Sequence, residues 1–408
     1  MVKNSKVVTI FLSNPCSISG KILRTESSWY RFVSKLGLDG DTFNIVSPEL
    51  KVRSSTFSIS LKMEVTANKI NHFFYSSFKE FYFKAMAHPI SFVKDYFNLV
   101  KASECIIFRI PTPGFTLIAI LSFLLKKPLV VFISGNIREQ SDSYFNSRGL
   151  FRLLLAVVLK LRVKLHSVFL KRCKHIFCVS SDVMQLYDLK GGDNVKIIRT
   201  PIISITDIDI DGARYFNKES PEIFKIIRVC WIQESKGLED LLVAVQRVSQ
   251  HHSISLDIFG TARDKVYGDK IKCLISELNI DKFVNLRGWI SNNDLQNIYQ
   301  DFDLHVMSSK AEGMPRVCLE SAAKGLPQLL CPVGGIPDFF KHLHDAYITK
   351  DCSSKSIQQG LEWFLNNREL IQSIANNALL GVRDSSIENV ADLVNKSIDI
   401  RKPRFNIS

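Results

Sequence analysis

Two glutamates eight positions apart, Glu312 and Glu320, have the type and spacing to act together in one site. A Gly-Met-Pro turn follows the first of them, and proline suits the first turn of a helix because its missing N–H would find no partner there. We therefore predict a helix from about Pro315 to Lys324 that stops at Gly325. Glu312 would lie just outside the helix start, and Glu320 would project from its second turn.

The start of this helix is the place where we expect a phosphate group. The N–H groups of Met314, Arg316 and Val317 would have no partner within the helix, and a helix N-terminus attracts anions. A diphosphate bound there would have one carboxylate on each side. That arrangement suits a nucleotide diphosphate-sugar, with one acid holding sugar hydroxyls and the other holding ribose hydroxyls. The alternative is an exposed loop acid and an unrelated helical glutamate.

Short β-branched runs alternate with helical stretches through both halves of the chain, which predicts parallel sheets covered on both faces. The predicted strands are 6–13, 41–47, 105–110, 129–134 and 175–180, then 224–232, 253–260, 283–290, 303–309 and 327–333. The expected fold class is α/β with two doubly wound, Rossmann-like domains. Such sheets bind ligands at the carboxyl ends of their strands, and the cleft between two such domains is the expected site.

The segment 285–340 resembles the carboxyl domain of family-4 glycosyltransferases. That family has, in order, a glycine-ended strand, a short helix ending in tyrosine, an apolar strand, E-G-x-P, a second glutamate, a small-residue helix and a G-G-x-P-E/D turn. The matching positions here are Gly288, Tyr299, 303–309, 312–315, Glu320, 321–325 and 334–338. The resemblance implies the GT-B architecture, in which two Rossmann-like domains face each other across a cleft.

Upstream, RVCWIQESKGLEDLLVAV resembles the family's G-R-x4-K-G segment, in which Arg and Lys clasp the donor diphosphate. Lys236 matches the family lysine, whereas Cys230 and Trp231 stand where Gly and Arg are usual. The second cation is therefore missing from its expected place. Arg316 is one candidate to supply it, because arginine binds phosphate bidentately. The rival interpretation is that Arg316 pairs with a neighbouring acid.

The resemblance also implies a mechanism, in which the sugar is transferred with retention and without a metal. Lys236 and the helix start would stabilise the leaving diphosphate. Glu312 would orient the transferred sugar, Glu320 would hold the ribose, and the backbone around Trp289 and Ile290 would meet the base. The catalytic residues are thus predicted to be Glu312 and Lys236. The predicted donor-binding residues are Glu320, Gly313, Met314, Pro315, Arg316, Val317, Trp289, Ile290 and Trp231.

The first half resembles the family's acceptor-binding domain more weakly. SNPCSISGKI, residues 13–22, occupies the place of a glycine-containing first loop, with Gly20 as the expected point of phosphate approach. A strand ending in R-x-P places Arg109 near the cleft. Asn136 and Arg138 follow a later strand where many relatives carry His or Asp, so no ionisable base is evident. A retaining reaction can use the leaving phosphate as its base instead.

The segment 200–222 interrupts the strand–helix alternation with Pro, Gly and several Asp. The predicted organisation is a basic, acceptor-binding N-terminal domain, a linker, a nucleotide-sugar-binding C-terminal domain, and a terminal helix that packs back on the first domain before a basic tail. Their predicted boundaries are 1–204, 205–222, 223–385 and 386–408. The D-x-D of DIDID, residues 207–211, falls in the linker with no sheet around it, so we expect no metal and no other cofactor.

The charge excess belongs to the first half of the chain. Residues 1–204 hold 29 Lys/Arg and 13 Asp/Glu, whereas residues 205–408 hold 24 and 27. Between Arg148 and Lys174 eight basic residues and no acid run through an apolar sequence. This pattern predicts a basic amphipathic helix on an anionic membrane surface. The alternative is a buried helix with a solvated basic face.

The cysteine content and the lengths of the apolar runs indicate the cellular compartment. Nine cysteines show no CxxC pair and no zinc spacing, which is typical of a reducing compartment. The longest apolar runs, 115–125 and 153–159, are too short to span a bilayer, and the first residues fit a buried strand better than a signal peptide. We therefore predict a cytoplasmic protein, peripheral on the inner face of the cell membrane.

The predicted function is a retaining glycosyltransferase that moves a sugar from a UDP- or GDP-sugar to a glycan acceptor, lipid-linked by the resemblance, in capsule, O-antigen or exopolysaccharide synthesis. A non-catalytic or partner-dependent GT-B subunit is an alternative, because the Gly-Arg pair is missing. Another nucleotide-sugar enzyme, such as an epimerase, would need several ionisable groups around the sugar. A nucleic-acid binder would use the basic half, but the aromatic–basic interleaving of an RNA surface is missing.

Overall fold

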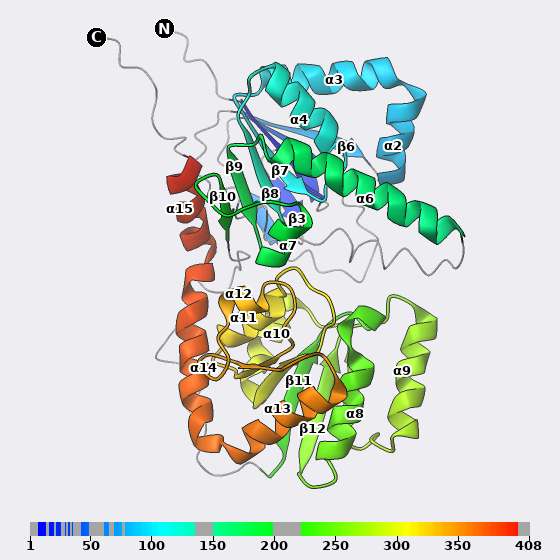
Figure 1. The fold of residues 1–408 in the computed structure, drawn as a ribbon, viewed down its shortest axis with the longest axis vertical. Coiled ribbons are helices and arrows are strands. Elements are labelled where there is room, and N and C mark those ends of the chain that lie inside the picture. The colour runs from blue at the N-terminus through cyan, green and yellow to red at the C-terminus, as the bar shows by residue number, and fades with distance from the viewer. Residues whose placement is uncertain are drawn as a thin grey trace. The chain divides into compact units, whose positions relative to one another are not determined.

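A computed structural model gives the fold of the chain (Figure 1). The chain forms two compact units, the first comprising Met1–Pro201 with Ile387–Ser408 and the second Ile202–Ser386. The structure describes residues 7–13, 16–19, 22–25, 29, 32, 35, 42–48, 61–64, 69–75, 78–134, 150–198 and 222–398. Of the predicted linker 205–222, only residue 222 lies within these ranges.

The first unit is built on a sheet of seven strands, all paired in parallel. Its order is β10-β9-β8-β7-β1-β4-β6. The strands are β1 (Val7–Phe11), β4 (Thr42–Pro48), β6 (Lys69–Tyr75), β7 (Cys105–Ile110), β8 (Leu129–Ile133), β9 (His175–Cys178) and β10 (Val195–Ile197). The five predicted strands of this half are confirmed, and β6 and β10 extend the sheet at its two edges. The order of the strands reverses between β1 and β7, which makes their carboxyl ends the ligand-binding edge of this unit.

Aromatic rings bind neighbouring strands of this sheet together. Phe11 of β1 stacks on Phe108 of β7, and Phe132 of β8 stacks on Phe177 of β9, with ring centroids 5.1 Å apart in both pairs. All four rings are fully buried. Such cross-strand pairs contribute packing beyond the apolar area that they bury.

The expected glycine loop at 13–22 is different in the structure. Cys16–Ser19 forms β2, which pairs antiparallel with β3 (Ile22–Thr25), and β3 pairs with β5 (Leu61–Glu64). Cys16–Ser19 is therefore part of a small three-stranded sheet rather than of a loop. Gly20 itself lies outside the described residues.

Helices of the first unit lie against the large sheet and against one another. They are α2 (Phe78–Ala87), α3 (Pro89–Ala102), α4 (Phe115–Leu124), α6 (Leu150–Leu170), α7 (Ser181–Leu186) and α15 (Ile387–Ile398). The helix predicted within 148–174 is confirmed as α6. The C-terminal α15 belongs to this unit, where Glu388 pairs with Lys35 at 3.7 Å. In the described part of the chain, no helix is both long enough and apolar enough to cross a membrane.

The second unit contains six parallel strands in the order β13-β12-β11-β14-β15-β16. They are β11 (Phe224–Val229), β12 (Ile254–Phe259), β13 (Val284–Gly288), β14 (Leu304–Met307), β15 (Gln328–Leu330) and β16 (Tyr347–Ile348). In chain order this is 3-2-1-4-5-6, the doubly wound arrangement of a Rossmann fold. The five predicted strands are confirmed, and β16 was not predicted because it is only two residues long.

Helices cover the second sheet. They are α8 (Leu238–Val248), α9 (Lys265–Glu277), α10 (Asn292–Ile298), α11 (Arg316–Ala322), α12 (Ile336–Phe339), α13 (Ser354–Asn366) and α14 (Arg368–Val382), with short 3-10 turns η3 (Glu234–Lys236), η4 (Tyr299–Asp301) and η5 (Arg383–Ser385). The predicted helix 315–324 is shorter than expected. Pro315, with ψ of 110°, is extended and only precedes α11. At the other end Gly325, with φ of +71°, is beyond the last helical residue.

Candidate functional site

The two predicted catalytic residues are in contact. Lys236 ends η3, which follows β11, and Glu312 lies in the loop that follows β14. The Lys236 Nζ lies 2.7 Å from the Glu312 Oε1, and their side chains are 15% and 16% exposed. Because β11 and β14 are neighbours where the strand order reverses, this ion pair lies at the topological switch point of the sheet. That is the edge at which doubly wound sheets bind their ligands.

Gly237 allows the lysine turn to approach the β14 loop. Its φ is +62°, and a Cβ built on it would lie 2.1 Å from the carbonyl oxygen of Ser308. No other residue fits there without moving one of the two backbones. Across the same contact the Ser308 hydroxyl donates to the Lys236 carbonyl at 2.9 Å. The glycine of the K-G sequence therefore allows the close backbone contact that places Lys236 beside Glu312.

The G-G-x-P-D turn supports Glu312 from the other side. A Cβ on Gly334, whose φ is +57°, would lie 2.3 Å from the carbonyl oxygens of both Glu312 and Gly313. The next residue, Gly335, donates its N–H to the Gly313 carbonyl at 2.6 Å. The E-G-M-P segment and the G-G-I-P-D turn, which are separate motifs in the sequence, are thus in direct backbone contact.

The second glutamate is paired within its own helix. The Arg316 guanidinium donates to the Glu320 Oε1 at 2.7 Å, and the Glu320 side chain is only 6% exposed. Of the two interpretations of Arg316, the structure contains the pairing with a neighbouring acid. The hydroxyl of Tyr299 is buried near Glu320 without a partner among the described residues. Burial first, and Glu320 second, raise the pKa of this phenol well above its usual range.

Two exposed tryptophans follow strands of the second sheet. Trp231, after β11, is 44% exposed, and the Arg263 guanidinium lies 4.9 Å from its ring centroid. Trp289, which directly follows β13, is 51% exposed. Ile290 instead packs against the buried cluster around Tyr299. The two predicted base-binding residues therefore differ, because the Trp289 indole is exposed whereas the Ile290 side chain is partly buried against the core.

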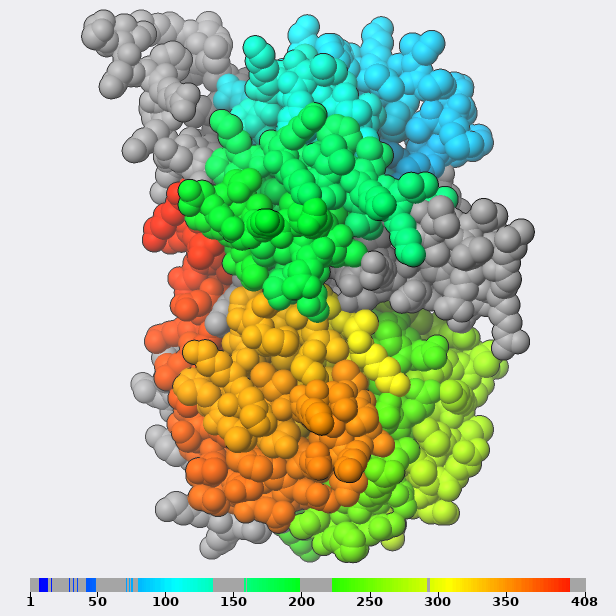
Figure 2. All heavy atoms as spheres, in the orientation of Figure 1, coloured from blue at the N-terminus to red at the C-terminus, as the bar shows by residue number. Residues whose placement is uncertain are grey.

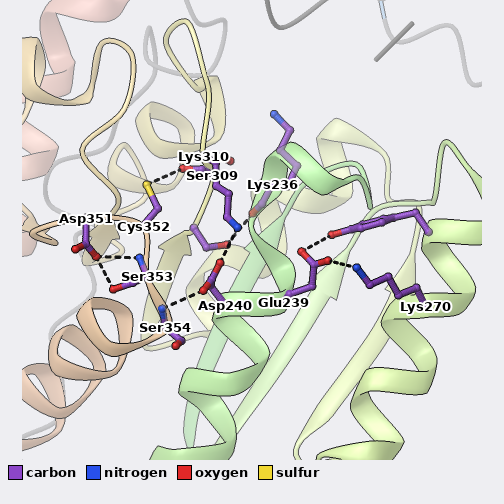
Figure 3. A network of polar contacts seen from close by, with 12 residues as sticks. Lys236, Glu239, Asp240, Lys270, Ser309, Lys310, Asp351, Cys352, Ser353 and Ser354 are labelled. Carbon is purple, nitrogen blue, oxygen red and sulfur yellow. Dashed lines mark hydrogen bonds and ion pairs between the residues drawn. The ribbon is translucent and has the colours of Figure 1, made fainter. Parts of the chain in front are cut away.

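A polar network that sequence reasoning missed fixes the loop carrying Glu312 (Figure 3). Lys310 pairs with Asp240 of α8 at 2.8 Å, and Asp240 also accepts the backbone N–H of Ser354 at 3.2 Å. The thiol of Cys352 lies 3.5 Å from the Ser309 carbonyl oxygen. These contacts tie the loop to the starts of two helices, which limits the freedom of Glu312.

Sequence reasoning also missed Arg228, which lies in β11. Its side chain is fully buried and donates to the Ser309 hydroxyl at 2.7 Å. The available signal was an arginine in the middle of the predicted strand FKIIRVCWI, between Ile227 and Val229. His305, in β14, was expected in the core and is fully buried there, with its Nδ1 2.8 Å from the Gln328 Oε1. Burial first, and the Arg228 charge second, lower the pKa of His305 to about 3.

On the first unit, Arg109 lies at the strand ends near the switch point. Its Nε donates to the Ser134 hydroxyl, which follows β8, at 2.7 Å. Its Nη1 donates to the Ser13 hydroxyl, which follows β1, at 3.2 Å, and its guanidinium lies 4.6 Å from the ring centroid of Trp29. Asn136 and Arg138, like Gly20, lie outside the described residues. These three acceptor-side residues therefore stay predictions from the sequence.

Solved structures share this pair of sheets. The chain resembles the Anabaena protein HepE, crystallised with UDP and glucose, at 15% identity and a TM-score of 0.65, over 97% of this chain and 100% of that one. It also resembles the lipopolysaccharide outer core galactosyltransferase WaaB, at 13% identity and a TM-score of 0.66, over 97% and 100% of the two chains. The fold is that of the GT-B glycosyltransferases.

The sequence of the second unit is similar to that of known glycosyltransferases. Residues 214–380, which lie within the second unit, match the model of the family described as glycosyl transferases group 1. An uncharacterized glycosyltransferase of Methanocaldococcus jannaschii is 27% identical over 157 residues, which are 38% of this chain and 40% of that protein. One from Haemophilus influenzae is 24% identical over 169 residues, 41% of this chain and 46% of that protein. The matches thus span less than half the length of these relatives.

Proposed function

We propose that this protein is a retaining, metal-independent glycosyltransferase that uses a nucleotide diphosphate-sugar. The observation that carries the proposal is the Lys236–Glu312 pair at the switch point of the second sheet. A cation there can neutralise a leaving diphosphate, and a carboxylate beside it can hold the transferred sugar and stabilise positive charge that develops on it. Two opposite charges in contact at a ligand-binding edge fit a substrate that carries an anionic leaving group and an electron-poor sugar carbon.

The remaining donor contacts follow from the positions around this pair. Trp289 is accessible for stacking with the base, and Glu320 is the proposed ribose ligand. Because Glu320 is already paired with Arg316, ribose binding would make use of its second carboxylate oxygen. The crystallised complexes of HepE with UDP and with UDP-glucose support UDP as the first nucleotide to test.

The acceptor is proposed to be lipid-linked and presented at an anionic membrane. In α6 the exposed lysines Lys160 and Lys164 alternate with the apolar residues Leu161 and Leu165, which are 61% and 47% exposed. A helix with this surface can place apolar side chains in the interface while its lysines meet lipid phosphates. Capsule, O-antigen or exopolysaccharide synthesis on the inner face of the cell membrane is the process that this arrangement suits.

The neighbouring helices extend the same kind of surface. α2 contacts α3, α3 contacts α4, and α4 contacts α6, and in Figure 2 α3, α4 and α6 form one continuous part of the first unit's surface. The α2–α3 pair exposes Phe83 at 67%, Met86 at 79% and Ile90 at 84%, which is unusual for large apolar side chains. Lys84 and Lys94 lie on the same two helices and are exposed too. Apolar residues flanked by lysines are consistent with a lipid surface.

Binding of UDP, GDP, ADP and CMP, measured by calorimetry without added metal, tests the donor site. We expect tight binding of one diphosphate by the wild type and at least about tenfold weaker binding by Glu320→Ala, because a lost hydrogen bond to a charged group costs about 1.5–3 kcal/mol. Glu277→Ala, a change at an exposed helical glutamate of the same unit, is the matched control and should bind normally. Failure of the wild type to bind any of the four nucleotides would contradict the proposal.

A partner-dependent subunit is the second candidate. The chain is 27% identical over 113 residues to the protein named as the GtfA subunit of a UDP-N-acetylglucosamine–peptide N-acetylglucosaminyltransferase of Streptococcus gordonii, which are 28% of this chain and 21% of that protein. Nucleotide binding without sugar transfer by the isolated chain would favour this candidate. An epimerase would instead interconvert free nucleotide-sugars without an acceptor, and a nucleic-acid binder would bind RNA or DNA with a steep dependence on salt.

A further inference from the structure

Arg228 is a buried cation without a carboxylate partner. Its side chain is 0% exposed, and no ion pair to it occurs among the residues that the structure describes. Its Nη2 donates to the Ser309 hydroxyl at 2.7 Å and lies 3.4 Å from the Lys236 carbonyl oxygen, while its Nε has no partner in that part of the chain. Removing a charge from water without an opposite charge beside it is strongly unfavourable. A purely structural reason for an arginine at this position is therefore weak.

The contacts of Arg228 lead directly to the proposed catalytic pair. Ser309, which accepts from Arg228, donates its own proton to the Glu312 Oε1 at 2.7 Å. The same oxygen accepts from the Lys236 Nζ at 2.7 Å. Arg228, Ser309, Glu312 and Lys236 thus form one chain of hydrogen bonds across the switch point, with two cations for one carboxylate. The group carries a formal excess of one positive charge.

Neighbouring titratable groups do not cancel this excess. His305 is neutral at physiological pH because burial and the Arg228 charge lower its pKa to about 3. The thiols of Cys230 and Cys318 are neutral too, because burial raises the pKa of each. The positive charge of Arg228 is therefore left for an anion that binds at the strand ends, in a region where low polarity strengthens electrostatic interactions.

We propose that Arg228 is a positioning residue that replaces the missing arginine of the K-G segment. Trp231 stands where that arginine is usual, and Arg316 is paired with Glu320, so neither supplies the second positive charge. Arg228 provides this second positive charge from within the sheet. It hydrogen-bonds to the Ser309 hydroxyl, and the same hydroxyl holds Glu312 in place. This inference rests on the proposed function, since its ligand is the diphosphate of the donor.

The test compares Arg228→Met with Arg247→Met, which removes the same charge at an exposed position near the end of α8. Affinities for UDP, GDP and ADP, and for the matching monophosphates, are measured by calorimetry. We expect Arg228→Met to weaken binding of the preferred diphosphate about tenfold or more and binding of its monophosphate much less. Arg247→Met should change neither. A loss of the diphosphate preference is a readout that a structural role alone would not produce.

Ser309→Ala separates the two parts of the proposal. It keeps the Arg228 charge but removes the hydroxyl between Arg228 and Glu312. Diphosphate affinity should then stay within about threefold of the wild type, whereas the kcat of sugar transfer should fall about tenfold or more. Should transfer be unaffected, the positioning of Glu312 through Ser309 would be wrong.

The outcomes distinguish this inference from the function on which it rests. If the wild-type protein binds none of the nucleotides, the proposed function is wrong. A wild type that binds a diphosphate which Arg228→Met binds equally well overturns only the role of Arg228. If Arg228→Met does not fold, Arg228→Lys decides, because it keeps the charge but not the reach of the guanidinium. Its diphosphate preference should survive while transfer falls, and a lost preference would overturn the inference.

Discussion

The ammonium group of Lys236 lies 2.7 Å from the carboxylate of Glu312, although 76 positions separate the two residues in the chain. Each residue stands at the end of a short segment that follows a central strand of the second sheet. Their contact places one cation and one carboxylate at the edge where a doubly wound sheet binds ligands.

Separate substitutions of the two partners should affect different steps of the reaction. Glu312→Gln should lower kcat about 100-fold or more with diphosphate affinity nearly unchanged, because charge is removed where the transition state needs it. Lys236→Met should weaken diphosphate binding about tenfold or more. Steady-state kinetics and calorimetry measure the two effects.

The matched controls are Glu239→Gln and Lys270→Met, which break the ion pair between α8 and α9 and should leave catalysis intact. Equal effects of the two site substitutions on kcat and on affinity would argue against divided roles.

Gly237→Ala should destabilise the second unit by about 2 kcal/mol or more. Its positive φ and the approach of the Ser308 carbonyl leave no room for a Cβ, so the lysine turn must shift. Gly381→Ala is the control in the last turn of α14, where the nearest atom outside that helix would lie 3.9 Å from the new Cβ. That change should be neutral or stabilising by about half a kcal/mol. Denaturant unfolding measures both, and a Gly237→Ala protein of wild-type stability would show that the turn can relax.

Acid should destabilise the protein through its buried histidines. The folded-state pKa of His305, about 3, is below the usual value of 6.5, so the unfolded chain binds more protons between these pH values. Stability is therefore full above pH 6.5 and falls as the pH drops, by about 2 kcal/mol at pH 5 for this one group. Burial likewise lowers the pKa of His166 to about 3, which adds a similar share in the first unit.

Thermal unfolding between pH 7 and pH 5 checks this pH dependence. His305→Asn keeps a donor near the Gln328 oxygen but cannot be protonated, so it should remove the His305 share of the acid sensitivity. His251→Asn, at an exposed position, is the control and should leave the slope unchanged. A pH profile of His305→Asn identical to that of the wild type would mean that His305 takes up no proton on unfolding.

Membrane binding should depend on the exposed lysines of α6. Reversing Lys160 and Lys164 to glutamate should weaken binding to vesicles containing phosphatidylglycerol by at least about tenfold, because each basic residue near such a surface contributes about 1 kcal/mol. Flotation with phosphatidylglycerol and with phosphatidylcholine vesicles measures it. The control reverses Arg247 and Lys355, two exposed cations of the second unit, with the same change in net charge. Failure of the wild type to bind either vesicle would remove the proposed membrane surface.

Much of the fold could be predicted because its signals are local. The β-branched runs predicted ten strands that the structure contains, and the K-G and E-G-M-P segments located Lys236 and Glu312. Periodicity fails where an element is very short, as for β16, or where the same residues suit either a strand or a loop, as for β2. The start of α11 was placed one residue early because a proline fits both the first helical position and the one before it.

The sequence by itself determined which segments form strands and which charged residues lie in the loops that follow them. Only the tertiary structure decided how those residues pair. Arg228 reaches Ser309 across 81 positions because β11 and β14 are neighbours in the sheet, and Arg316 turns to Glu320 because the two face each other one helical turn apart. The order of strands sets such contacts, and it depends on burying the whole sheet rather than on any local pattern. For this reason the sequence did not indicate that Arg228, inside β11, contacts the loop that carries Glu312.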